Sequence, residues 1–185
     1  MKRAFLIHGW DGTPSNHWFP YLSLELKANG FDVSAPQMPN AAEPKVKEWL
    51  SFLKDYVGKP DADTYFVGHS LGCITIARYL ETLSPKAKIG GCVFVAGFSG
   101  RLEIPEIREF YELPFNPEKA KAHCDKFVML FSDNDPFVPM EKSLEMAKQV
   151  GAKTILERGK GHFTARDGVT ALPNALSALL KMAGV

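Results

Sequence analysis

Short apolar runs rich in β-branched and aromatic residues recur along the chain, with room for a helix between one run and the next. Runs of this kind with turn residues on either side are typical of buried strands. Six of them are found, at residues 4–7, 31–34, 64–67, 92–96, 127–131 and 153–156. Because strands that alternate with helices usually join one parallel sheet, the pattern predicts an α/β fold. We expect a mostly parallel sheet of about six strands with helices on both faces.

Between these runs, apolar residues recur every three or four positions, which is the spacing of one face of a helix. The pattern predicts helices over residues 46–57 and 176–183, and another that begins at Pro139 and ends near Val150. A further helix carries Trp18 and Leu22 and ends before Gly30, which can adopt the left-handed conformation that closes a helix.

The stretch of residues 99–126 follows neither pattern. It mixes apolar side chains with charges and three prolines, and it is too apolar for a solvated linker. We predict a short lid-like insertion over the edge of the sheet, where open α/β sheets bind ligands. No linker, repeat or low-complexity tract interrupts the chain, so residues 1–185 are expected to form a single α/β domain.

Composition and charge narrow the class of protein. Apolar residues make up 45% of the chain and charged residues 23%, the balance of an ordinary globular protein. With 22 basic and 21 acidic side chains the net charge is +1, which argues against nucleic acid or an anionic membrane as partner. We expect a small-molecule partner, and no feature of the sequence indicates a protein partner.

Neither a membrane span nor an export signal is expected. The first strand-like run leaves no room for an apolar signal segment before it. The longest apolar stretch, residues 89–98, is about half of the roughly 20 residues that a membrane span needs. The cysteines Cys73, Cys92 and Cys124 contain no Cys-x-x-Cys pair and are interpreted as reduced thiols. A cytoplasmic location is the expectation.

The segment around Ser70 carries the strongest chemical signal. A strand-like run leads into Gly68-His69-Ser70-Leu71-Gly72, and an apolar helical run follows. A serine in such a strand-to-helix turn sits on a strained backbone with its hydroxyl above the sheet, and the glycines let strand and helix approach closely. The blander alternative is a turn with a helix-capping serine. We interpret Ser70 as a nucleophile, with the Leu71 N–H as a first donor to the oxyanion.

The loop after the first strand is the expected source of a second oxyanion donor. It begins His8-Gly9-Trp10, a glycine-bearing turn of the type that supplies this donor in hydrolases. We assign the role to the Trp10 N–H, with Gly9 as the neighbour that lets backbone and substrate approach. His8 precedes the serine in the chain, the wrong order for the base of such a site, and is interpreted as a buried histidine that braces the loop.

A serine hydroxyl needs a neutral imidazole to take its proton, and a carboxylate to fix the tautomer of that imidazole. His162 is the candidate base, because it alone of the five histidines follows the last strand, on a loop with two glycines. Asp135 is the preferred carboxylate, since Pro136 keeps it extended on a stiff loop after the fifth strand. Asp133 is the rival, and spacing alone does not decide between the two. The order of serine, aspartate and histidine matches the hydrolase order.

Aromatic residues near these loops are candidates for an apolar acyl site, although core packing is the usual role of any single aromatic side chain. The candidates are Trp10, Trp18, Phe98, Phe110, Tyr111 and Phe137. No metal is expected, because neither H-E-x-x-H nor any paired ligand spacing is present.

Together these motifs resemble the small serine hydrolases of the YdeN-like, retinoblastoma-binding-protein type within the α/β-hydrolase superfamily. The resemblance also includes Asn16-His17-Trp18-Phe19-Pro20, which is more particular than the elbow motif. It implies a trimmed α/β-hydrolase sheet with a minimal lid, the triad of Ser70, Asp135 and His162, and no cofactor.

The predicted function is hydrolysis of a small carboxylic ester, or of a thioester or amide, through an acyl-enzyme. The alternative from another class is a binding or regulatory protein that keeps the fold with little turnover. A metallohydrolase built on His8, Asp11, Asp133 or Asp135 is a further alternative. A haloperoxidase or lyase on the same scaffold also stays open, because fold does not determine reaction.

Overall fold

A single parallel sheet organises the chain in the computed structural model, which describes residues 1–185. Its strands run in the order β2-β1-β3-β4-β5-β6, and every neighbouring pair is parallel. The strands are β1 (Arg3–Ile7), β2 (Asp32–Ser34), β3 (Thr64–His69), β4 (Gly91–Val95), β5 (Phe127–Phe131) and β6 (Lys153–Leu156). The six strands predicted from the apolar runs are therefore confirmed, and the sheet is wholly parallel.

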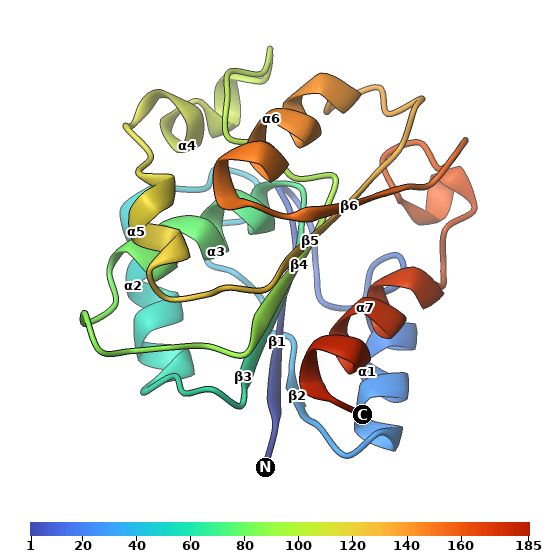
Figure 1. Ribbon diagram of the computed structural model, residues 1–185. Helices are drawn as coiled ribbons and strands as arrows, with labels where there is room; N and C mark the ends of the chain where they lie inside the picture. Colours follow the sequence, from blue (N-terminus) through green and yellow to red (C-terminus); the bar gives the residue numbers. More distant parts are fainter.

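Helices cover both faces of this sheet, as expected. On one face lie α1 (Phe19–Ala28) and α7 (Pro173–Ala183), seen to the right of the sheet in Figure 1. The other face is covered by α2 (Val46–Val57), α3 (Leu71–Glu81), α5 (Pro117–Lys121) and α6 (Met140–Val150). The short elements are η1 (Pro105–Ile107), α4 (Glu109–Glu112) and η2 (Ala165–Asp167). Gly30 closes α1 with a positive φ of 82°, the conformation predicted for it.

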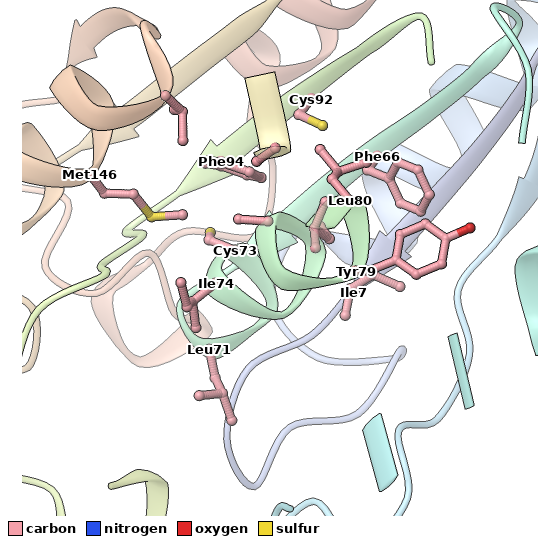
Figure 2. Packing of buried hydrophobic residues seen from close by; sticks show 14 of the residues in the cluster. Ile7, Phe66, Leu71, Cys73, Ile74, Tyr79, Leu80, Cys92, Phe94 and Met146 are labelled. Atoms are coloured by element: carbon pink, nitrogen blue, oxygen red, sulfur yellow. The ribbon is translucent and has the colours of Figure 1, made fainter. Parts of the chain in front are cut away.

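Each face of the sheet carries its own hydrophobic core, because successive side chains of a strand point to opposite faces. In β1, Phe5 and Ile7 join the cluster under α2, α3 and α6, whereas Ala4 and Leu6 join the cluster under α1 and α7. Figure 2 shows the first cluster around α3, where the Tyr79 ring packs 5.6 Å from that of Phe66 on β3. Both faces of the central strands are thus buried, which explains their unbroken apolar runs.

The insertion of residues 99–126 packs on α3 through a buried arginine. The Arg78 guanidinium donates hydrogen bonds to the backbone carbonyls of Phe110, Leu113 and Pro114. The Phe110 ring is fully buried in the core beneath. The insertion is therefore held at its middle, between η1 and α5.

The strand order creates a crevice at one edge of the sheet. From β1 the chain passes to β2 on one side, whereas from β3 it passes to β4 on the other, although β1 and β3 are neighbours. The loops that leave their carboxyl ends therefore diverge, and such a switch point is where open α/β sheets bind ligands. None of the helices has the length and apolar character of a membrane span.

Candidate active site

A cavity of about 220 Å³ lies at this switch point, above the carboxyl ends of β1 and β3. Ser70 and His162 both line it, as do Gly9 and Trp10 from the loop after β1. The volume is below the several hundred Å³ of most drug-sized pockets, so the cavity suits a small ligand.

Ser70 occupies a strained turn between β3 and α3. Its φ is 51°, in the left-handed region that a serine rarely adopts. A Cβ on Gly72 would collide with the carbonyl oxygen of Ile7, and one on Gly68 would lie 2.8 Å from the backbone nitrogen of Cys73. Only glycine at these two positions allows β1, β3 and the start of α3 to meet this closely, which is the predicted reason for both glycines.

Two backbone N–H groups near Ser70 have no acceptor within the protein. Neither the Trp10 N–H nor the Leu71 N–H donates a hydrogen bond within the protein. The loop after β1 approaches the elbow closely, because a Cβ on Gly9 would lie 3.1 Å from Ser70 Cβ and 3.7 Å from Leu71 N. The Leu71 N–H is also at the N-terminus of α3, where the helix dipole favours negative charge.

His162 is paired with Asp135 and not with Asp133. The His162 Nδ1 lies 2.8 Å from Asp135 Oδ2, and the two side chains are 12% and 2% exposed. The other oxygen of Asp135 accepts hydrogen bonds from the N–H groups of Phe137 and Val138, each at 2.9 Å. Three hydrogen-bonding contacts on its two oxygens thereby fix the orientation of this carboxylate.

Asp133 instead holds the neighbouring loop. Its Oδ1 accepts a hydrogen bond from the Gly159 N–H at 2.8 Å, and its Oδ2 lies 3.2 Å from Arg158 Nη1. The Gly159 hydrogen bond and the Arg158 charge lower the pKa of this carboxyl below its ordinary value. The choice between the two aspartates that spacing leaves open is thus made by contact with His162.

Ser70 and His162 face the same cavity without a direct hydrogen bond between their side chains. The Ser70 hydroxyl makes no hydrogen bond within the protein, and His162 uses only Nδ1 for its side-chain pairing. Such hydrogen bonds are often loose in the absence of substrate and tighten in the complex.

Comparison with known proteins identifies the family. The model of the serine hydrolase family matches residues 4–181. The chain belongs to this serine hydrolase family. It is 34% identical to YdeN of Bacillus subtilis (strain 168) over 173 residues, which cover 93% of this chain and 91% of YdeN. It is 27% identical to the serine hydrolase RBBP9 of Rattus norvegicus over 166 residues, 87% of each chain.

Solved structures agree with this assignment. The crystal structure of the B. subtilis ydeN product superposes with a TM-score of 0.96 at 33% identity and covers 100% of both chains. Est1E from Butyrivibrio proteoclasticus, solved with ferulic acid bound, shares the fold with a TM-score of 0.78 at 17% identity, covering 100% of this chain and 90% of that one. The resemblance to YdeN-like hydrolases and the α/β-hydrolase fold are confirmed.

In this serine hydrolase, the backbone of the His162 loop is tied down at several successive residues. Lys160 N–H donates to Ser132 Oγ at 3.0 Å, and Gly161 N–H donates to Asn134 Oδ1 at 2.8 Å. The His162 N–H donates to Asp167 Oδ2 at 3.1 Å. Sequence reasoning did not assign these partners, although Ser132 and Asn134 lie in the same polar segment as Asp135.

Asp167 contributes a second constraint on this loop. Partial burial opposes ionisation of Asp167, but hydrogen bonds from Thr164 and from the His162 N–H outweigh it, and the pKa of its carboxyl is lowered. A Cβ on Gly161, whose φ is 51°, would collide with this carboxylate. The loop therefore needs glycine at position 161 for two reasons.

Two buried histidines near the site are structural. His8 Nε2 accepts a hydrogen bond from the Met38 N–H at 2.9 Å, which confirms the predicted bracing role, and burial lowers its pKa. His69 is buried beside Ser70 and donates from Nε2 to the carbonyl oxygen of His162 at 2.8 Å. Burial holds the pKa of His69 well below the usual value, so its ring stays neutral.

Only part of the predicted apolar pocket lines the cavity. Gly9, Trp10 and Phe137 do so. Trp18, Phe98, Phe110 and Tyr111 do not, and this part of the prediction is wrong. Trp18, Phe98 and Phe110 are fully buried in the two cores, and Tyr111 packs against the core with its hydroxyl directed to the carbonyl of Ile104.

Trp18 and Phe98 lie outside the insertion and belong to the cores on the two faces of the sheet. For Phe110 and Tyr111, the reason for the error is the direction in which the insertion folds. Its aromatic side chains turn towards α2 and α3, where the Phe110 ring meets that of Trp49 at 5.6 Å. The insertion instead presents Ile104 and Ile107 to the cavity. In the sequence, only their position in the predicted lid-like insertion indicated that these two residues could line a site.

Proposed function

We propose that this serine hydrolase cleaves small carboxylic esters through an acyl-enzyme, with Ser70 as nucleophile, His162 as general base and Asp135 as the carboxylate that orients it. The observation that carries the proposal is the 2.8 Å contact between His162 Nδ1 and Asp135 Oδ2 beside the elbow serine. A histidine in this contact carries its proton on Nδ1, which leaves Nε2 free to accept one.

Acylation begins with attack of Ser70 Oγ on the ester carbonyl carbon, while His162 Nε2 takes the hydroxyl proton. Negative charge develops on the carbonyl oxygen, and the free Trp10 and Leu71 N–H groups are the donors that would bind it. Loss of one such donor typically slows a reaction about 10²- to 10³-fold. The bond to the alcohol then breaks, and the imidazolium of His162 gives its proton to the leaving oxygen.

Deacylation repeats these steps with water as the nucleophile. His162 takes a proton from water as it attacks the acyl carbon, and the Ser70 oxygen leaves and recovers that proton. Asp135 stays ionised throughout and stabilises the imidazolium that forms twice in each cycle. The enzyme returns to its starting state with one ester converted to an acid and an alcohol.

The size and lining of the cavity favour short substrates. A volume of about 220 Å³ accommodates a few carbon atoms on either side of the ester. Ile104, Ile107 and Phe137 give it an apolar wall for an alkyl group. We expect 4-nitrophenyl acetate and butyrate to be hydrolysed faster than the octanoate.

The test is labelling by a fluorophosphonate probe together with hydrolysis of 4-nitrophenyl esters of graded acyl length. The wild type should be labelled and active, and Ser70→Ala should lose both. Ser51→Ala, a change on the exposed side of α2, is the matched control and should behave like wild type. Activity should persist in the presence of a chelator. A folded wild type that neither reacts with the probe nor hydrolyses any of the esters would overturn the proposal.

A further inference from the structure

The loop between β1 and α1 places two polar side chains in the cavity that the proposed reaction does not use. Asn16 and His17 are both half-buried, and both line the cavity with Ser70 and His162. His17 has a φ of 55°, and this left-handed backbone conformation determines the direction in which its side chain leaves the loop. Its ring lies 5.7 Å from that of His69, which in turn lies 4.9 Å from that of His162.

The hydrogen bonding of His17 fixes which of its ring nitrogens carries the proton. The backbone N–H of Ala165 donates to His17 Nδ1 at 3.0 Å, and an N–H can only donate to an unprotonated nitrogen. The proton of the neutral ring is therefore on Nε2, which has no partner within the protein. Burial, together with the nearby His162, lowers the pKa of His17 and keeps the ring neutral.

Asn16 is fixed in the same way. The backbone N–H of Thr13 donates to Asn16 Oδ1 at 2.8 Å, which identifies the oxygen of the side-chain amide. The Nδ2 group carries two N–H donors and has no partner within the protein. Asn16 and His17 thus each offer a neutral N–H donor, at Nδ2 and Nε2. Each side chain is oriented by a backbone N–H that donates to its acceptor atom, Oδ1 of Asn16 or Nδ1 of His17.

The remainder of the lining indicates what these donors would bind. No lysine or arginine lines the cavity, and the one formally charged group in the lining is the carboxylate of Asp11. A negatively charged substrate group would be repelled by Asp11 and would have no cation to pair with. A neutral oxygen acceptor satisfies the donors without that repulsion.

We propose that Asn16 Nδ2 and His17 Nε2 bind a neutral oxygen atom of the substrate, so that the preferred esters carry an ether, hydroxyl or carbonyl oxygen besides the scissile ester. This inference rests on the proposed esterase function and adds a substrate class to it. Purely alkyl esters would leave both donors without a partner once the cavity is filled and water is displaced, which costs binding free energy.

Two substitutions remove the donors and leave the loop contacts in place. Asn16→Asp keeps the oxygen that accepts from Thr13 and replaces the amide nitrogen by an oxygen. His17→Asp keeps an acceptor close to the position of Nδ1, carries no donor in place of Nε2, and suits a positive φ, which aspartate tolerates. Ser15→Ala, on the same loop but outside the lining, is the matched control.

The measurement is the ratio of kcat/KM for two isosteric esters that differ by one oxygen in place of a methylene. The acyl side is probed by 4-nitrophenyl methoxyacetate against 4-nitrophenyl butyrate, and the alcohol side by 2-methoxyethyl acetate against butyl acetate. A loss of general activity or a small shift of the His162 loop affects both members of a pair and cancels in the ratio. Circular dichroism and probe labelling of each variant check that it is folded.

We expect each donor substitution to lower the ratio by about two- to tenfold in one of the pairs, which also identifies the side of the ester that the donors contact. Ser15→Ala should leave both ratios equal to those of the wild type within experimental error. If both variants hydrolyse the esters through Ser70 with unchanged ratios in both pairs, the inference is wrong and the proposed function stands. If the wild type hydrolyses no ester, both fall together.

Discussion

At the scale of single residues, the most informative contact is that of Asp135. Its carboxylate accepts from two backbone N–H groups on one oxygen and contacts His162 on the other. A short side chain held at three points cannot turn away from the imidazole. Asp133, two residues earlier, uses both of its oxygens on the loop that follows β6. The same residue type therefore contacts the histidine at one position, where we propose a chemical role, and holds a loop at the other.

Asp135→Asn should lower kcat for ester hydrolysis on the order of 10⁴-fold at neutral pH. The amide can still accept from Phe137 and Val138, but its NH₂ group then faces His162 Nδ1 and favours the tautomer with the proton on Nε2. That tautomer cannot take the proton of Ser70. Steady-state kinetics with 4-nitrophenyl acetate measure the effect. Asp133→Asn should cost less than about tenfold, because the loop keeps its other ties, and equal losses in the two variants would refute the assignment.

At the scale of elements, the connection from β6 to α7 places His162. Four of its residues, Gly159, Gly161, Phe163 and Gly168, have positive φ, so its path is set by backbone conformations that few sequences adopt. Hydrogen bonds from several successive N–H groups then fix this path against the loop after β5. The position of His162 thus depends on the loop after β5 as well as on its own loop.

Gly161→Ala should reduce kcat at least tenfold, because its Cβ would collide with the Asp167 carboxylate and displace the adjacent His162. The matched control is Gly159→Ala. Gly159 has a similar positive φ of 67°, but a Cβ there meets nothing within 4 Å. Both variants should lose about 1–2 kcal/mol of stability from backbone strain, and only Gly161→Ala should lose activity, as measured by urea denaturation and ester hydrolysis.

The packing of the insertion on α3 depends on one buried side chain, that of Arg78. Arg78→Met would leave the carbonyls of Phe110, Leu113 and Pro114 without their donor, and we expect a loss of roughly 2–3 kcal/mol in the free energy of unfolding. KM should also rise, because Ile104 and Ile107 of the insertion line the cavity. Arg101→Met removes only an exposed ion pair with Glu103 and should change neither quantity measurably.

At the scale of the whole molecule, the fold keeps three histidines neutral near the site. Burial is the main cause of the lowered pKa values of His8, His17 and His69. In the unfolded chain these histidines regain an ordinary pKa of about 6.5. Below that pH the unfolded state binds protons that the native state does not, so unfolding becomes more favourable as the pH falls.

Stability should therefore decrease between pH 7 and pH 5, with a slope of up to about 1.4 kcal/mol per pH unit for each fully buried histidine. The carboxyls with lowered pKa, Asp133 and Asp167, act in a separate window, since their stabilisation is lost only as the pH falls below about 4. Urea denaturation at a series of pH values measures the slope. His69→Gln, which keeps a donor for the His162 carbonyl, should give a shallower dependence, and an unchanged slope would show that His69 does not contribute.

Most of the fold could be predicted from the sequence, because buried strands and helices have characteristic patterns of apolar residues that are local in the chain. A buried parallel strand must be apolar on both faces, and residues 92–96 and 127–131 show this without any knowledge of their neighbours. The insertion has no such pattern. Its aromatic residues suit a pocket wall and a core equally well, and only the Arg78 contacts and the packing of Phe110 on Trp49 decide between them.

The sequence by itself determined the class of fold and the glycine-flanked turn at Ser70, and it predicts His162 as the base, because these inferences depend on residues adjacent in the chain and on the order of motifs. The tertiary structure decided which aspartate meets His162, 27 positions away, and brought His69 to the carbonyl of a residue 93 positions later. It also decided which side chains line the cavity. Such contacts depend on where separate loops meet in space. The local pattern of residues does not give the distance between side chains on different loops.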